Sequence, residues 1–151
     1  MGDNKWMNTT KTVLAIDDDI AITELLSIIL RTHGFEALTA NNSEDGLRLI
    51  SEKSPDAITL DLMMPDIDGL EMCKRIRAIS RTPILVLSAI NDPAMVATVL
   101  DAGADDFIVK PVPSAVLIAH LNTLIRRSLG TGALEHNVTA KWLPGSAPLS
   151  S

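Results

Sequence analysis

Three aspartates stand where apolar, strand-like runs end. Asp17 and Asp18 follow a run that begins at Thr12, and Asp61 closes a later run that begins at Ala57. If the two runs form neighbouring parallel strands, their carboxyl ends meet at one edge of the sheet. Three carboxylates there repel one another unless a hard cation neutralises them. Oxygen ligands in this number suit Mg²⁺, with Asp18 and Asp61 as direct ligands and Asp17 acting through water.

A simpler role exists for the first group of acids. Asp17, Asp18 and Asp19 precede a helical pattern, and an aspartate at that place can cap a helix by accepting a backbone N–H bond. We expect Asp19 to be this cap. For Asp17 and Asp18 the ligand role is favoured, because Asp61 supplies the matching charge on the other strand.

The elements that must position these residues alternate regularly from Thr12 to about Leu129. Apolar runs of strand length alternate with stretches in which apolar residues recur at helical spacing. The predicted strands are residues 12–17, 35–40, 57–61, 84–88 and 106–110. The predicted helices are residues 22–30, 43–52, 70–79, 93–102 and 114–127. Ser43 is the expected cap of the second helix, and Gly34 is the expected end of the first.

Five strands alternating with five helices predict an α/β fold. The expected architecture is a doubly wound five-stranded parallel sheet with helices on both faces. The sequence does not fix the order of the strands. The predicted strand ends carry the acids, at the edge where such sheets place their sites.

Four short motifs lie in order on these strand ends. They are the acidic pair Asp17–Asp18, the stretch LDLMMPDIDG at 60–69, the step Ser88–Ala89, and GADDFIVKP at 103–111. Together they resemble the receiver domains of response regulators in two-component signalling, over roughly residues 12–129. The resemblance implies the flavodoxin-like receiver fold.

The resemblance also implies a mechanism. Asp61 would accept a phosphoryl group from a sensor histidine kinase, a phosphotransfer protein or a small acyl phosphate. Mg²⁺ and Lys110 would hold the phosphoryl oxygens, and the backbone carbonyl of Met63 would complete the metal shell. Such a domain is a signalling acceptor that catalyses only its own phosphorylation and dephosphorylation.

The same resemblance implies a switch. The Ser88 hydroxyl would turn to donate to the phosphoryl group, and Phe107 would move into the space that it leaves. Pro111 would follow Lys110 through a cis bond. The change would be reported on the face made by the fourth helix, the fifth strand and the fifth helix.

The sequence departs from the family pattern at several places. Phe107 stands where many relatives carry Tyr. Because phenylalanine has no hydroxyl group, the inward and outward positions of its ring would differ only in packing. Met63 and Ile90 stand at positions that flank the phosphoryl group in the family, and both are apolar. Because neither can orient an attacking water molecule, we expect slow self-dephosphorylation.

The end of the fifth helix bears on the output. Its pair Arg126–Arg127 resembles the helix ending of the class of response regulators whose output is a winged-helix DNA-binding domain. In that class, receivers form homodimers through charged pairs on the face of the fourth helix, the fifth strand and the fifth helix, here called the switch face. Asp106 and Arg127 are expected to remain available for such pairing. Neutral residues stand at three positions where charges are often found: Val96, Val116 and His120. The sequence leaves open a more apolar homodimer or another partner for this face.

Composition excludes several classes. The chain has 151 residues and a net charge of −6, with two Phe, two Trp and no Tyr, so direct nucleic-acid binding by this domain is not expected. No apolar run approaches the ~20 residues of a membrane span. The lone Cys73 is expected to be a buried filler in a reducing compartment, and we expect a cytoplasmic protein. Residues 1–11 are predicted to be a flexible leader and residues 130–151 a linker or disordered tail.

Rival functions receive less support. Asp66 and Asp68 match the Asp-x-Asp of haloacid-dehalogenase-type phosphatases, but Met64 and Pro65 precede them where that motif needs a strand. A nucleotide- or flavin-binding module would need a Gly-rich loop after a strand, which is absent from the sequence. A receiver that acts only by protein contact, or a stand-alone receiver in a phosphorelay, remains the alternative to a regulator with an output domain.

Overall fold

The structure, a computed structural model, describes residues 9–142. The strands are β1 (Thr12–Ile16), β2 (Glu36–Ala40), β3 (Ala57–Asp61), β4 (Ile84–Ser88) and β5 (Asp106–Val109). The helices are α1 (Ile20–Thr32), α2 (Ser43–Lys53), α3 (Gly69–Ile79), α4 (Pro93–Asp101) and α5 (Ser114–Trp142). The predicted alternation of five strands and five helices is confirmed, with most boundaries within two residues.

The five strands form one parallel sheet in the order β2-β1-β3-β4-β5. This order, which the sequence left open, confirms the doubly wound sheet. In the β1–β3 register Ile16 pairs with Leu60. The next residue of each strand segment, Asp17 and Asp61, therefore lies at the same edge of the sheet. The point where the winding reverses therefore lies between the strand ends that carry the three aspartates.

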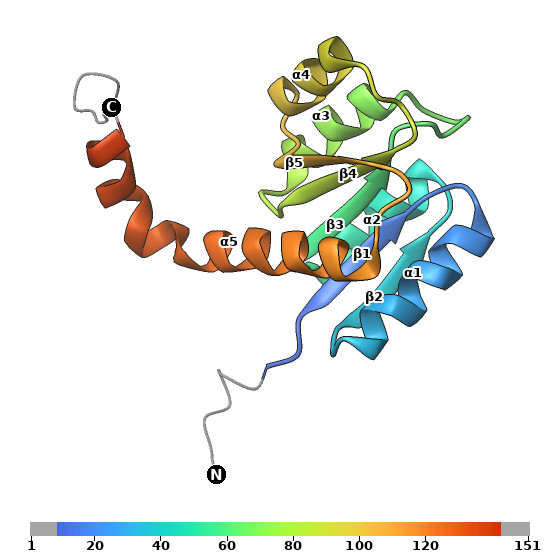
Figure 1. Cartoon of the computed structure of the whole chain (residues 1–151), viewed down its shortest axis with the longest axis horizontal. Coiled ribbons are helices and arrows are strands. Elements are labelled where there is room, and N and C mark those ends of the chain that lie inside the picture. Colours follow the sequence, from blue (N-terminus) through green and yellow to red (C-terminus); the bar gives the residue numbers. More distant parts are fainter. Residues whose placement is uncertain (1–8, 143–151) are drawn as a thin grey trace.

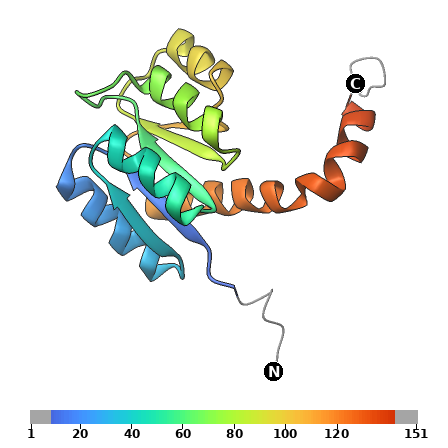
Figure 2. The same ribbon diagram turned by 180° about the vertical axis from the view of Figure 1, so that it is seen from behind.

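Helices cover both faces of the sheet (Figure 1). The first buried cluster joins Met72, Ile76 and Val99 of α3 and α4 to β1, β3 and β4, and Ile50 of α2 belongs to it. The second cluster joins the same strands to α1 and α5, mainly through Leu30, Leu117 and Leu121. Figure 2 shows α2 and α3 in front of the sheet, on the side away from α1 and α5. These two cores hold the strand ends in fixed positions.

Short polar residues begin most of the helices. The Asp19 side chain accepts from Ala21 N and caps α1, which confirms the predicted cap. The predicted Ser43 cap of α2 is wrong by one residue, because Asn42 has the extended backbone and accepts from Asp45 N. Ser43 is therefore the first residue of α2, and its own N–H group is free to meet a partner elsewhere.

The fifth helix is longer than predicted. It continues past Arg127 to Trp142, and its last part runs beyond the end of the sheet (Figures 1 and 2). Residues 130–142, predicted as linker or tail, are therefore helical, whereas 143–151 lie outside the described residues. Most of the predicted leader, residues 1–8, also lies outside them. Within residues 9–142 no helix is long and apolar enough to cross a membrane.

Candidate functional site

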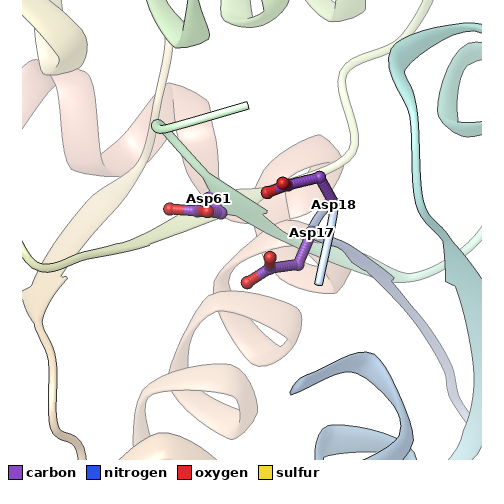
Figure 3. A group of neighbouring side chains, drawn as sticks. All are labelled: Asp17, Asp18 and Asp61. Carbon is purple, nitrogen blue, oxygen red and sulfur yellow. The ribbon is translucent and has the colours of Figure 1, made fainter. Parts of the chain in front are cut away.

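The three aspartates meet at the carboxyl edge of the sheet (Figure 3). One carboxylate oxygen from each of Asp17, Asp18 and Asp61 lies within 4.8 Å of the others. Asp17 is 3% exposed and Asp61 8% exposed, whereas Asp18 lies at the surface. The predicted cluster is thus assembled from two adjacent strands, with one open side.

The ammonium group of Lys110 lies against the buried part of the cluster. Lys110 Nζ is 3.2 Å from Asp17 Oδ2 and 4.0 Å from Asp61 Oδ1. The lysine follows β5, its backbone N–H donates to Ser88 O at 2.8 Å, and its bond to Pro111 is cis. Lys110 therefore bridges the two acidic strand ends from the far side of β4.

The pKa of Asp61 is raised above its ordinary value of 3.8. Burial away from water is the largest cause, and the nearby charges of Asp17 and Asp18 act in the same direction. The Met63 N–H group and Lys110 act in the opposite direction without cancelling the rise. A cation bound among the three carboxylates would favour the ionised form of Asp61.

The loop after β3 folds closely around Asp61. Met63 N donates to Asp61 Oδ1 at 3.2 Å, and Met63 pairs with Asp68 in an isolated bridge. Leu62 is buried, and a Cβ atom at Gly69 would lie 2.7 Å from Leu62 Cα. Only glycine permits this approach, so the loop closes over a short path and presents Met63 at the surface, 60% exposed.

The two predicted switch residues lie on neighbouring strands. Ser88 is completely buried at the end of β4, and its Oγ accepts from Ile90 N at 3.2 Å. Phe107 is partly buried and pairs with Val86 in the β4–β5 register. Ser88 therefore stands at the edge of the sheet that holds the acids, whereas Phe107 lies further down β5, next to the core of α3 and α4.

One pairing prediction needs correction. Asp106, expected to be available to a second receiver, contacts His120 Nδ1 of its own α5 through Oδ2 at 2.5 Å. Its other oxygen accepts from Phe107 N at 2.8 Å. The contact with His120 ties β5 to α5 on the predicted switch face.

Two anchoring contacts were not predicted from the sequence. Asn41 Nδ2 donates to Asp17 O at 2.8 Å, and Ser43 donates to Asp66 Oδ2 through both N and Oγ. The partners are 24 and 23 positions apart, so local sequence patterns carry no signal for them. The only hint was the polar run Asn41–Asn42–Ser43 after β2.

The donor atoms fit a hard divalent cation. Three carboxylates converge, the donor set is all oxygen, and one side of the cluster is open to solvent through Asp18. These are the ligands that Mg²⁺ takes in proteins, with waters in the remaining positions.

The sheet order, the acidic cluster at the winding reversal and the lysine beside it define the class of receiver domains. The chain matches the family model of the response regulator receiver domain over residues 13–122. It belongs to that family.

Known relatives agree with this placement. The transcriptional regulatory protein AfsQ1 of Streptomyces coelicolor is 46% identical over 115 residues, which are 76% of this chain and 51% of that protein. The DNA-binding response regulator MtrA of Mycobacterium tuberculosis is 37% identical over 116 residues, or 77% of this chain and 51% of that protein. The chain thus spans about half the length of these curated relatives.

Solved structures give the same result. A two-component response regulator from Clostridium difficile superposes with a TM-score of 0.76 at 29% identity, over 79% of this chain and 98% of that one. The chemotaxis protein CheY4 of Vibrio cholerae gives a TM-score of 0.73 at 31% identity, over 77% and 99%.

Proposed function

We propose that this receiver domain accepts a phosphoryl group on Asp61 and relays that event as a signal. The observation that carries the proposal is the surrounding of Asp61, a buried carboxylate with two further carboxylates and the Lys110 ammonium within reach. A carboxylate held only for structure would not gather like charges around it, because their repulsion destabilises the fold.

In the proposed reaction an Asp61 oxygen attacks the phosphorus of a phosphohistidine. The O–P bond forms, the N–P bond breaks, and the imidazole leaves and takes up a proton. Lys110 holds a phosphoryl oxygen by charge and hydrogen bonding. Asp18, Asp61 and the Met63 carbonyl, with Asp17 acting through water, would hold Mg²⁺, which would supply positive charge to offset the charge on the transferring group.

The signal would leave the site through Ser88 and Phe107. Ser88 Oγ, which accepts from Ile90 N, would turn so that its O–H group donates to a phosphoryl oxygen. This rearrangement frees space above β5, and the packing of Phe107 shifts towards its inward arrangement. The shifted population alters the face of α4, β5 and α5.

The phosphoryl donor has a suitable surface beside the site. An apolar groove of about 480 Å³ runs between α1 and the segment after β5, and Leu25, Val112 and Leu117 line it together with Lys110. Since Lys110 both lines the groove and lies against the acidic site, a protein seated in the groove would lie beside that site. We assign this groove to the donor, a histidine kinase or phosphotransfer protein.

Two outputs are compatible with a receiver domain. The relatives named above are transcriptional or DNA-binding regulators of about twice the matched length, which favours control of a DNA-binding domain joined to α5. A stand-alone receiver in a phosphorelay is the alternative. In either case the domain would signal from the cytoplasm and act on no substrate apart from its own phosphoryl donors.

The proposal is tested by intact mass after incubation with acetyl phosphate, with and without Mg²⁺. The wild-type chain is expected to gain one phosphoryl group only when Mg²⁺ is present, and Asp61→Asn to gain none. A folded wild-type chain that gains no adduct would refute phosphoryl acceptance. An adduct retained in Asp61→Asn would place the acceptor elsewhere.

A further inference from the structure

The segment between β2 and α2 reaches both loops that carry the acids. The first loop follows β1 and contains Asp17 and Asp18, and the second follows β3 and contains Met63 and Asp66. In the sheet, β2 neighbours β1 but not β3. The start of α2 nevertheless contacts the β3 loop, and residues 41 and 43 make one set of side-chain hydrogen bonds to each loop.

Asn41 holds the first loop. Its Nδ2 group donates to Asp17 O at 2.8 Å and to Thr23 Oγ1 at 3.0 Å. The preceding residue adds a backbone bond, from Asp17 N to Ala40 O at 3.1 Å. The peptide unit between Asp17 and Asp18 is therefore fixed both to β2 and, through Thr23, to α1.

Ser43 holds the second loop. Asp66 Oδ2 accepts from Ser43 N at 2.8 Å and from Ser43 Oγ at 2.7 Å. The N–H group is one of those that a helix leaves unpaired at its start, where partial positive charge favours a carboxylate. These bonds lower the pKa of Asp66 below its ordinary value of 3.8. Asp66 lies between Met63 and Asp68, so the bond fixes the outer part of the loop.

The residue between the two anchors has a separate task. Asn42 accepts from Asp45 N and donates to Asp45 Oδ2, both within α2. Its side-chain bonds therefore stabilise the helix without touching either acidic loop. The segment thus offers two contacts that span the site and one local contact of similar kind.

We propose that Asn41 and the Ser43–Asp66 pair form a clamp that sets the distance between the two halves of the metal site. They are positioning residues, and the inference rests on the proposed function. Mg²⁺ demands near-ideal octahedral geometry at short distances. A clamp that fixes the Asp17–Asp18 peptide on one side and the Met63 loop on the other supplies this geometry before the ion arrives.

The test is the dissociation constant of Mg²⁺, measured by isothermal titration calorimetry on the whole chain. Asn41→Ala and Asp66→Ala each remove one side of the clamp, and we expect roughly tenfold weaker binding for each, as for other residues that orient metal ligands. Asp66→Asn keeps an oxygen that can accept from Ser43 and should recover most of the affinity.

Asn42→Ala is the matched control. It removes a helix cap worth about 1 kcal/mol but neither clamp contact, so its Mg²⁺ affinity should stay within about twofold of wild type. Asp66 is exposed, so Asp66→Ala provides a folded variant even if Asn41→Ala does not fold.

The clamp proposal would be overturned if Asp66→Ala bound Mg²⁺ with wild-type affinity. It would also be overturned if Asn42→Ala weakened Mg²⁺ binding as much as the clamp variants do. The phosphoryl adduct on the wild-type chain is measured separately. If the wild-type chain binds Mg²⁺ but takes no adduct, the proposed function fails, while the comparison of dissociation constants still decides whether the clamp exists.

Discussion

At the scale of single residues, the environment that suits Asp61 to its proposed function also lowers the stability of the fold. The raised pKa means that the ionised form is less favourable in the folded, metal-free chain than in the unfolded one. With respect to Asp61, the metal-free protein is therefore most stable below pH 3.8. Its stability falls as the pH rises through the higher pKa that Asp61 has in the folded chain. In its ionised form Asp61 therefore destabilises the metal-free fold.

The Asp61→Asn variant should relieve this destabilisation. Because asparagine does not ionise, we expect the metal-free variant to be more stable than wild type at neutral pH, by on the order of 1 kcal/mol, with the difference shrinking towards acidic pH. Urea unfolding in the presence of a chelator measures it. Asp101→Asn, at an exposed position of α4, is the control and should change little; a destabilised Asp61→Asn would contradict this prediction.

The exposed Met63 bears on how long the phosphorylated state lasts. Met63 and Ile90 carry no group that can orient water, so the aspartyl phosphate is expected to persist for minutes or longer. Met63→Asn should shorten the lifetime several-fold, because its amide can hold an attacking water. Decay of the intact-mass adduct after removal of acetyl phosphate measures it. A wild-type lifetime of seconds would show that water reaches the phosphorus without help from these positions.

At the scale of elements, α1 contributes an apolar surface beside the chemistry rather than a reacting group. Leu25 is 53% exposed and lines the same groove as Lys110. An exposed leucine at such a place is explained if another protein covers it during transfer.

The Leu25→Glu variant separates docking from chemistry. A charge in the groove should lower the rate of phosphoryl transfer from the partner protein at least about tenfold, since it must be desolvated in the complex, and should leave phosphorylation by acetyl phosphate unchanged. Ile79→Glu, at a similarly exposed position of α3, serves as the control. Equal loss with both donors would mean that the variant damages the site, and no loss with the partner would place docking elsewhere.

At the scale of the whole molecule, the face of α4, β5 and α5 is the surface through which a homodimer is predicted. Leu100 of α4 and Val116 of α5 are 40% and 41% exposed, and Asp106 of β5 already contacts His120 of α5. A homodimer through this face would therefore rest more on apolar contact than on charged pairs between chains.

Phosphorylation should promote that homodimer. Sedimentation velocity with acetyl phosphate and Mg²⁺ is expected to show a shift from monomer towards dimer, and Val116→Lys to abolish it by burying an unpaired charge. Ile28→Lys, on α1, should leave the shift intact. A monomer under both conditions would assign the face to a different partner.

The sequence by itself determined the order and approximate bounds of the elements, and it predicted which residues form the site, because both depend on local patterns. Apolar spacing gave five strands and five helices, and the motifs placed Asp17, Asp18, Asp61 and Lys110 at strand ends. The end of α5 was misjudged because Gly130 and Gly132 weaken a helix without terminating it. The first proline after Ser114 is Pro144, so no proline interrupts the described part of α5.

Only the tertiary structure decided which strand ends are neighbours and what holds them in place. The order β2-β1-β3-β4-β5 brings the acids together, and the bonds from Asn41 to Asp17 and from Ser43 to Asp66 fix them. Periodicity reports which face of an element is buried, but a hydrogen bond between residues more than twenty positions apart depends on how the elements pack. The sequence therefore predicts which residues would bind the metal, whereas the distances between them are a property of the fold.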